Sequence, residues 1–424
     1  MLTVVSMGLG VALVVAVLVV YGVVNQSFHR GGEGYDLIVG AKGGKEQLVL
    51  NTVFYLSQPI GNIPYSLYEE LTEGKYGRVE TAIPVCMGHT YQGFRVIGTV
   101  PEMFAELKYR GNESYKFAEG KNFEADNRFG AVMGAIAAYR TRLHVGEKFQ
   151  AVHGSGGDGP VHKEQFTIVG VLAPTGTPVD RAVFVNMMGF QDIHHHEEAA
   201  SEERHAAEEA AAKKTDNTKH AKHDEHHEHA EHEHAGEPRE VTAVLVCLQK
   251  NYADRGGTDI TAKLINNGRV AQAVVPVRVI DELFEGIVGK LQFILLGMAV
   301  LTVIEAGIGI MVSIYNSMSD RRHEIAVMRA LGASRFTVMV IILLESILLS
   351  MMGGAMGLLV GHSAIYACSP MIADWTGVVV GLWQFQLGEL ILIPGLVVLA
   401  SAVGYLPALS AYRTDVAKSL ITTP

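Results

Sequence analysis

The 424-residue chain is poor in charge, poor in cysteine and without a nucleotide-binding signature. Charged residues make up 18% of it, below the roughly 25% of an ordinary soluble protein. They are almost absent from four runs: 2–24, 291–314, 337–361 and 390–412. No basic stripe with interleaved aromatic residues occurs, so the sequence does not support nucleic-acid binding. The chain is also too long for one compact core, and we expect separate parts.

The cysteines are too few for a disulfide framework, because only Cys86, Cys247 and Cys368 are present. Cys86 and Cys247 share one predicted domain, and the sequence leaves open whether they pair. The glycine cluster at 40–45 lacks the first glycine and the Ser or Thr of a phosphate-binding loop, so we interpret it as a turn. With no His-Glu-x-x-His motif and no nucleophile–base pair, we predict no enzyme, and any ATPase activity is expected on a separate chain.

The four uncharged runs are each long enough to cross a bilayer, since a core of about 30 Å needs about 20 helical residues. The first run has neither a basic start nor a small-residue cleavage site, which favours an uncleaved anchor over a signal peptide. The third carries small residues that allow close helix packing in lipid: Gly353, Gly354, Gly357 and Gly361.

Two carboxylates, Glu305 and Glu345, lie inside predicted spans. An intramembrane carboxylate is a candidate functional group because its burial in lipid is costly. The alternative is structural: either side chain is neutral or forms a hydrogen bond between helices at a dimer seam.

The distribution of Lys and Arg predicts the orientation. The connection between the second and third spans is basic, and so is the tail after the fourth span, whereas 362–389 has no Lys or Arg. We therefore expect both termini in the cytoplasm and residues 25–286 outside. The predicted fold is a membrane protein with four transmembrane α-helices and a large α+β extracytoplasmic domain between helices 1 and 2.

Within residues 25–286, alternating and apolar patterns indicate strands and helices. The expected strands are 36–39, 79–87, 94–100, 148–152, 166–172, 181–186 and 241–248. The expected helices are 64–74, 130–143 and 258–266.

A histidine- and glutamate-rich insert occupies residues 194–240 and contains eleven of the eighteen histidines. Neutral imidazoles suit zinc, copper and nickel, so the insert is a candidate zinc site. The candidate ligands are His220, His223, His226, His227, His229, His232 and His234. The alternative is a solvated, flexible insert whose charge keeps it soluble.

The connection after the second span predicts a short amphipathic helix from about Asp320 to Leu331. Gly332 is expected to end it, and Ser334 to cap the next span. Such a helix either lies on lipid headgroups or docks a cytoplasmic partner. Its apolar face contains Ile325, Met328 and Leu331.

The sequence Arg-Arg-His-Glu-Ile-Ala-Val-Met-Arg-Ala-Leu-Gly-Ala-Ser at 321–334 resembles the cytoplasmic loop of the FtsX/MacB-type ABC permease family. The glycines at 307–311, the third span, and the segment 407–413 are similar to that family too. In the outer part, 117–123 and 166–172 resemble its MacB-like periplasmic core. The resemblance implies a MacB-like core domain at 25–286 and an FtsX-like permease domain at 287–424.

What the resemblance implies is a permease homodimer or heterodimer in the bacterial inner membrane, driven by a cytoplasmic ABC ATPase subunit that holds ATP and Mg. No cofactor is expected on the chain itself. Membrane lipid and a periplasmic partner are further expected contacts. The residues matched to the ATPase-docking helix are Arg321, Arg322, Glu324, Ile325, Arg329, Ala330, Leu331, Gly332 and Ala333. Ile325 and Leu331 are expected to enter a groove on the ATPase.

Two other functions stay open at this point. The histidine insert suits a membrane-anchored metal-binding or sensor module, for which tight zinc binding without an ATPase partner is the discriminating observation. Some relatives of the family activate a cell-wall hydrolase, and a co-purifying hydrolase would favour that alternative.

Overall fold

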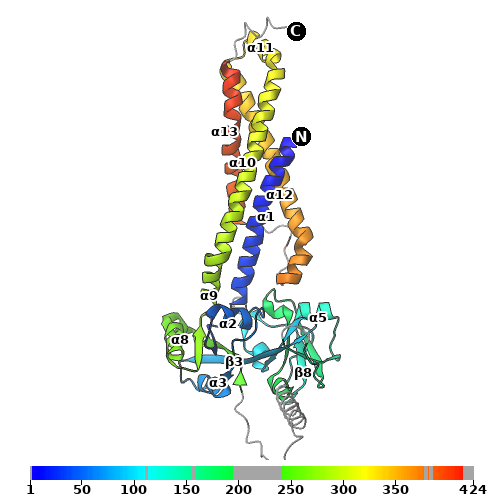
Figure 1. Ribbon diagram of the computed structural model, residues 1–424, viewed down its shortest axis with the longest axis vertical. Coiled ribbons are helices and arrows are strands. Elements are labelled where there is room, and N and C mark those ends of the chain that lie inside the picture. The colour runs from blue at the N-terminus through cyan, green and yellow to red at the C-terminus, as the bar shows by residue number, and fades with distance from the viewer. Residues whose placement is uncertain are drawn as a thin grey trace, which may run out of the picture. The chain divides into compact units, whose positions relative to one another are not determined.

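The computed structural model describes residues 2–109, 113–154, 159–193, 240–376, 381 and 385–413 (Figure 1). It divides into two compact units. The helical unit comprises Met1–Ser27 and Leu283–Pro424, and the sheet domain comprises Phe28–Glu282. The seven histidines proposed as zinc ligands in the insert lie outside the described residues, so that prediction is unaffected.

Among the described residues, the helical unit contains four helices long and apolar enough to cross a membrane, at the four places where the sequence predicts spans (Figure 1). A fifth, short helix follows the second of them. The helices are α1 (Leu2–Gly31), α10 (Gly289–Asp320), α11 (Arg322–Ala330), α12 (Arg335–Thr376) and α13 (Leu392–Arg413), with the 3₁₀ turn η4 (Leu387–Ile391) and the π-type turn η3 (Phe284–Val288).

The third uncharged run ends at residue 361, whereas the helix α12 continues to Thr376. At about 1.5 Å per residue its 42 residues reach about 63 Å, roughly twice a hydrocarbon core. The apolar run ends earlier than the helix does, and hydropathy therefore marked the span and not the helix.

The glycines of α12 bring α1 close to it. A Cβ atom built on Gly357 would lie 2.6 Å from the carbonyl oxygen of Gly8, and one on Gly361 would lie 3.0 Å from Cγ1 of Val15. Three residues before Gly357, Gly354 faces α13, where a Cβ would lie 2.5 Å from Cδ1 of Leu396. The predicted role of these glycines in close helix packing is confirmed.

The sheet domain is built around an eleven-stranded mixed sheet, whose central path has the order β15-β1-β14-β3-β4-β12-β8-β11-β7. These strands are β1 (Leu37–Ala41), β3 (Val79–Tyr91), β4 (Phe94–Thr99), β7 (Phe117–Gly120), β8 (Gly130–Met133), β11 (Phe166–Leu172), β12 (Ala182–Asn186), β14 (Ala243–Leu248) and β15 (Ala271–Val274). Two short strands join from the side, β9 (Lys148–Phe149) on β11 and β10 (Val152–His153) on β3.

Short helices and two minor strand pairs complete the domain. The helices are α2 (Lys45–Thr52), α3 (Tyr65–Thr72), α4 (Glu102–Ala105), α5 (Ala135–Thr141), α7 (Lys250–Tyr252), α8 (Thr258–Asn267) and α9 (Pro276–Leu283), with the turns η1 (Pro178–Arg181) and η2 (Ala253–Gly257). The strand pairs are β2 (Ile63–Pro64) with β13 (Glu240–Val241), and β5 (Lys108–Tyr109) with β6 (Glu113–Ser114).

The expected helix at 130–143 is wrong in its first part. Residues Gly130–Met133 form β8, which pairs with β11 on one side and β12 on the other, and all four are buried. The helix α5 begins only after Gly134, where a Cβ would lie 2.4 Å from the carbonyl oxygen of Val179. Burial between two strands overrides a local pattern that fits a helix.

Cys86 and Cys247 do not form a disulfide. Cys247 on β14 lies opposite Thr81 of β3, five residues along that strand from Cys86. Five strand residues extend about 16 Å, whereas the Cα atoms of a disulfide lie within about 7 Å of each other. Both thiols are largely buried, which raises the pKa of each to about 12.

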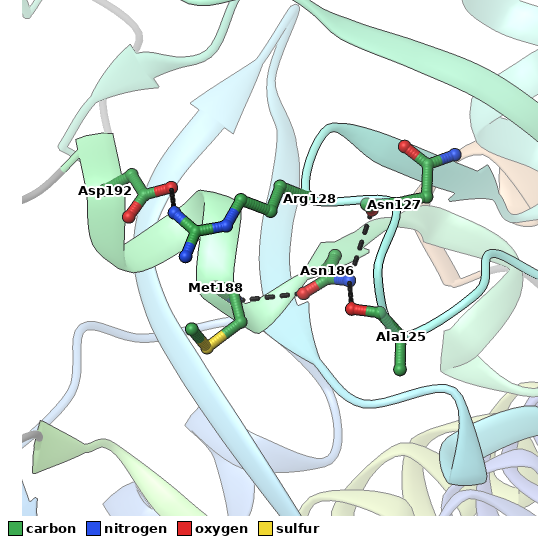
Figure 2. Close-up of polar contacts among 6 residues, drawn as sticks. All are labelled: Ala125, Asn127, Arg128, Asn186, Met188 and Asp192. Atoms are coloured by element: carbon green, nitrogen blue, oxygen red, sulfur yellow. Dashed lines mark hydrogen bonds and ion pairs between the residues drawn. The ribbon is translucent and has the colours of Figure 1, made fainter.

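A buried amide fixes the end of β12 and the helical segment that follows it, residues 187–193. Figure 2 shows Asn186 donating from Nδ2 to the carbonyl oxygens of Ala125 (3.0 Å) and Asn127 (3.1 Å). Its Oδ1 accepts from the backbone N–H of Met188 at 2.9 Å. Arg128 Nη1 adds an ion pair to Asp192 Oδ2 at 2.8 Å (Figure 2). The loop around residue 127 thereby holds the segment that leads into the histidine insert.

Candidate functional site

The elbow, residues 321–334, joins α10 to α12 and contains α11. The helical path breaks at Arg321, whose φ of −92° and ψ of 10° are non-helical. At the other end, Gly332 has a φ of +107°, a left-handed conformation that glycine adopts without strain. The N–H of Gly332 donates to the carbonyl of Arg329 (3.1 Å) and that of Ala333 to Met328 (3.0 Å), which is a Schellman motif. The predicted C-cap is confirmed.

The entry to α12 is capped as the sequence predicts. Ser334 Oγ accepts from the backbone N–H of Thr337 at 3.1 Å. Gly332 caps the C-terminus of α11, and Ser334 caps the N-terminus of α12. The backbone of the elbow is therefore held by hydrogen bonds at both caps.

The apolar side chains of the elbow differ in their exposure, and Met328 is 37% exposed. Ile325 is 7% exposed and packs in the core of the helical unit with Ile314, Val338 and Ile342. Leu331, in contrast, is 84% exposed. The expectation that Ile325 enters a groove on a partner is therefore corrected, because its side chain already lies inside this chain.

The remaining side chains matched to the docking motif lie on or near the surface. Glu324, Ala330 and Gly332 are exposed, and Arg329 and Ala333 are half-buried. Arg322 is the first residue of α11, and its side chain is outside the described part of the structure. The surface of the elbow is thus mixed in polarity, with Leu331 as its most exposed large apolar residue.

Glu345, predicted inside the third span, has a partner at the elbow. Its Oε1 lies 3.7 Å from Nη1 of Arg321, and both side chains are about half exposed. A small pocket of about 80 Å³ beneath α11 is lined by both residues together with Glu324, Ile325 and Met328. Glu305 lies elsewhere, exposed on the surface of α10. The two carboxylates are therefore not brought together.

A second polar pair in the helical unit was not foreseen. His362 Nε2 of α12 lies 2.9 Å from Oε2 of Glu389 in η4, and both side chains are at most 10% exposed. The other carboxylate oxygen of Glu389 accepts from the backbone N–H of Gln386 at 2.9 Å. The partners are 27 residues apart in the chain. The signal available in the sequence was a carboxylate directly before the fourth apolar run.

The sheet domain has an open groove of about 600 Å³ beside α5. Arg140, Arg142 and Glu119 line it with Tyr139, whose side chain is exposed. The groove is open and its lining carries both signs of charge, as ordinary protein surface does. The described residues of its lining bring together no nucleophile and base.

Two models of known protein families match this chain. The FtsX-like permease C-terminal model matches residues 296–416, and the MacB-like periplasmic core domain model matches residues 1–219. The second match covers more than half of the chain. Together with the four apolar helices and the elbow, these matches define a membrane permease of the ABC transporter class. The chain belongs to the FtsX/MacB-type family of ABC transporter permeases.

Curated relatives agree with this assignment. An uncharacterized ABC transporter permease, YknZ, of Bacillus subtilis is 28% identical over 181 residues, which cover 41% of this chain and 44% of the relative. An uncharacterized ABC transporter permease of Methanocaldococcus jannaschii is 30% identical over 93 residues, 22% and 25% of the two chains.

The macrolide export ATP-binding/permease protein MacB 1/2 of Paracoccus denitrificans is 27% identical over 157 residues, 37% of this chain and 21% of the relative. The chain therefore matches less than half the length of each of these relatives. It has no match to an ATPase domain model.

Proposed function

We propose that this chain is the membrane subunit of an ABC transporter, which couples ATP hydrolysis by a separate ATPase to movements of the sheet domain for export or extraction of a substrate. In this proposal the permease works as a homodimer or heterodimer in the bacterial inner membrane. The elbow and both termini face the cytoplasm, and the sheet domain faces the periplasm. The basic residues of the elbow and the uncharged 377–388 region support this orientation.

The observation that carries the proposal is the form of the elbow. A nine-residue helix, capped at Gly332, presents Leu331 at 84% exposure while Ile325 anchors it from beneath. An exposed aliphatic side chain can anchor a partner by entering a pocket, and arginine is enriched among the residues that carry binding energy at interfaces. Since Leu331 directly follows the helix α11 that contains the buried Ile325, a displacement at Leu331 is passed to α10 and α12.

The test compares two leucines of equal exposure. Leu331 in the elbow and Leu387 in η4 are each 84% exposed, and α12 separates them in the chain. Tagged full-length chain is purified with the ATPase subunit that accompanies it, and the bound ATPase and its ATP hydrolysis are quantified. We expect Leu331→Ser to lower the amount of ATPase by at least about tenfold, since a lost anchor costs about 1.4 kcal/mol or more.

Leu387→Ser is the matched control and is expected to keep the ATPase at the level of the unchanged protein. Equal retention of the ATPase by both variants would refute the docking role of the elbow. A Gly332→Val variant gives a second measure, because a β-branched residue at a φ of +107° disturbs the cap without removing Leu331.

A further inference from the structure

Three histidines of the sheet domain converge although the first of them is far from the other two in the sequence. His89 lies on β3, His153 on β10, and His162 on the return arm of the hairpin that begins with β10. The ligand atoms that they offer all lie within 4.8 Å of one another. None of them belongs to the histidine insert, and the sequence patterns gave no sign of the cluster.

The strand register puts all three side chains on one face. His153 lies directly opposite His89 in the antiparallel pairing of β10 with β3. Within the hairpin Val152 pairs with Val161, and His162 donates its backbone N–H to the carbonyl of Ala151 at 3.0 Å. Side chains alternate along a strand, so His153 and His162 share a face of the hairpin, and His89 shares it with His153.

Backbone contacts fix this arrangement. The register of β3 against β4 shifts between Met87 and His89. Gly88, at that bulge, accepts at its carbonyl from the backbone N–H of Gly154 (2.8 Å), and Thr90 Oγ1 donates to the carbonyl of Gly154 (3.0 Å). The hairpin is thereby held on β3 at both residues that flank His89. Bulges of this kind re-aim a side chain and are common beside functional sites.

The imidazoles are also largely withdrawn from water. His89 is 0% and His162 is 9% exposed, and His153 is half-buried. The ring centroid of His89 lies 4.6 Å from that of His162 and 5.2 Å from that of His153. The ring of Phe190 packs edge-on against His89, with 4.8 Å between their centroids. Packing alone is better served by aliphatic residues, because two charged imidazoles in such a place would repel each other.

We propose that His89, His153 and His162 bind a divalent transition-metal ion of the zinc class. Neutral imidazole nitrogen is a preferred ligand of zinc, cobalt, nickel and copper. As far as the described residues show, the cluster contains no carboxylate, which disfavours calcium and magnesium.

The distances fit a zinc ion after a small movement. Zinc–nitrogen bonds of about 2.1 Å in a tetrahedron place the nitrogens about 3.4 Å apart, so separations that lie within 4.8 Å have to close by at most about 1.4 Å. Rotation of the half-buried His153 ring supplies part of this movement. Three protein ligands leave a fourth position for water or for a ligand that is exchanged.

The position of the site relates it to the histidine insert. Phe190, which contacts His89, lies in the segment 187–193 that Asn186 and Arg128 hold in place. The chain enters the insert at residue 194, four residues after Phe190. An ion bound by the three histidines would fix the hairpin to β3 next to this entry. The proposal concerns the sheet domain and does not depend on the docking of an ATPase.

The experiment must separate this site from the insert. The parent protein is full-length chain in which the eleven histidines between His194 and His234 are replaced by asparagine. Zinc bound after equilibrium dialysis and the visible absorption of bound Co²⁺ are measured, with Mg²⁺ as the competing ion. We expect about one ion per chain and the intense Co²⁺ absorption of a four- or five-coordinate nitrogen site, unaffected by Mg²⁺.

His89→Gln, His153→Gln and His162→Gln in this parent are each expected to weaken Co²⁺ and Zn²⁺ binding by more than about 100-fold, since even outer-sphere changes cost about 10- to 100-fold. His144→Gln is the matched control, because this histidine of the same domain has a side chain that is 70% exposed. It is expected to bind as the parent does.

Circular dichroism of the metal-free variants establishes that they are folded, and the rise in melting temperature on adding Zn²⁺ gives a second readout. If His89→Gln does not fold because this position is fully buried, the metal binding of His153→Gln, at a half-buried position, decides whether the site exists. A parent that takes up no Co²⁺, or His153→Gln and His162→Gln variants that keep the parent's Co²⁺ absorption and zinc-induced rise in melting temperature, would overturn the proposal.

Discussion

Replacement of Gly357 by alanine tests whether the contact of α1 with α12 depends on the absence of a side chain. The added Cβ would lie 2.6 Å from the carbonyl oxygen of Gly8 and 2.6 Å from Cβ of Val11. Carbon atoms attract best at about 3.5–4.0 Å, so the helices have to separate by about 1 Å. Because one of the opposing atoms is backbone, a side-chain rotation cannot relieve this contact.

Two other glycines separate packing from helix propensity. Alanine stabilises a helix interior by about 1 kcal/mol relative to glycine. A Cβ on Gly297 of α10 meets nothing within 4 Å, so Gly297→Ala should show that gain alone. A Cβ on Gly354 meets Cδ1 of Leu396 at 2.5 Å, the end of a side chain that can rotate. Gly354→Ala should therefore be close to neutral.

For Gly357→Ala, overpacking that costs about 1–3 kcal/mol opposes the gain of about 1 kcal/mol in propensity. We expect the free energy of unfolding to fall by up to about 2 kcal/mol, and to lie about 1–3 kcal/mol below that of Gly297→Ala. The assay is unfolding of the detergent-solubilised chain by titration with SDS, followed by the helical circular dichroism. If Gly357→Ala is as stable as Gly297→Ala, the close contact of α1 with α12 is refuted.

Two further predictions concern the sheet domain. Asn186→Ala leaves the buried partners of its amide unsatisfied and should lower the free energy of unfolding by about 1–3 kcal/mol. Arg128→Ala removes a partly exposed ion pair and should lower it by less than about 1 kcal/mol. Equal losses of stability in melting experiments would contradict this order. Burial raises the pKa of the Cys86 and Cys247 thiols from 9.0 to about 12, so at pH 8 iodoacetamide should label both about a thousandfold more slowly in the folded than in the unfolded chain, as mass spectrometry can measure. Since the folded pKa is the higher one, the stability that these neutral thiols contribute is complete below about pH 9 and is lost as the pH rises toward 12.

Hydropathy predicted the four spans because a bilayer imposes both length and polarity on each helix. Turn chemistry predicted the elbow equally well, since Gly332 and Ser334 act through their nearest neighbours. The strand 166–172 coincides with β11, because its flanking residues are polar or turn-forming. Sequence patterns are sufficient where a structure is determined by residues that are close to one another in the chain.

The misses share a different cause. Gly130–Met133 became a strand because β11 and β12 flank it, and these strands lie tens of residues further along the chain. The cluster of three histidines depends on the register of β10 against β3 and on one bulge, neither of which a sequence pattern specifies. Composition pointed instead to the histidine insert, because eleven of the eighteen histidines lie there.

The burial of Ile325 changes how the elbow has to work if an ATPase drives it. Ile325 and Leu331 were both expected to enter a groove on the partner, yet Ile325 is buried whereas Leu331 is exposed. Burying an isoleucine side chain stabilises a contact by about 1.5–3 kcal/mol, whereas a half-exposed ion pair such as Arg321–Glu345 contributes at most about 1 kcal/mol. The apolar contact of Ile325 with α10 and α12 is therefore the stronger link from the elbow to the spans. In the proposed function, a partner that binds Leu331 would therefore act on the spans through α11, because Ile325 packs this helix against both α10 and α12.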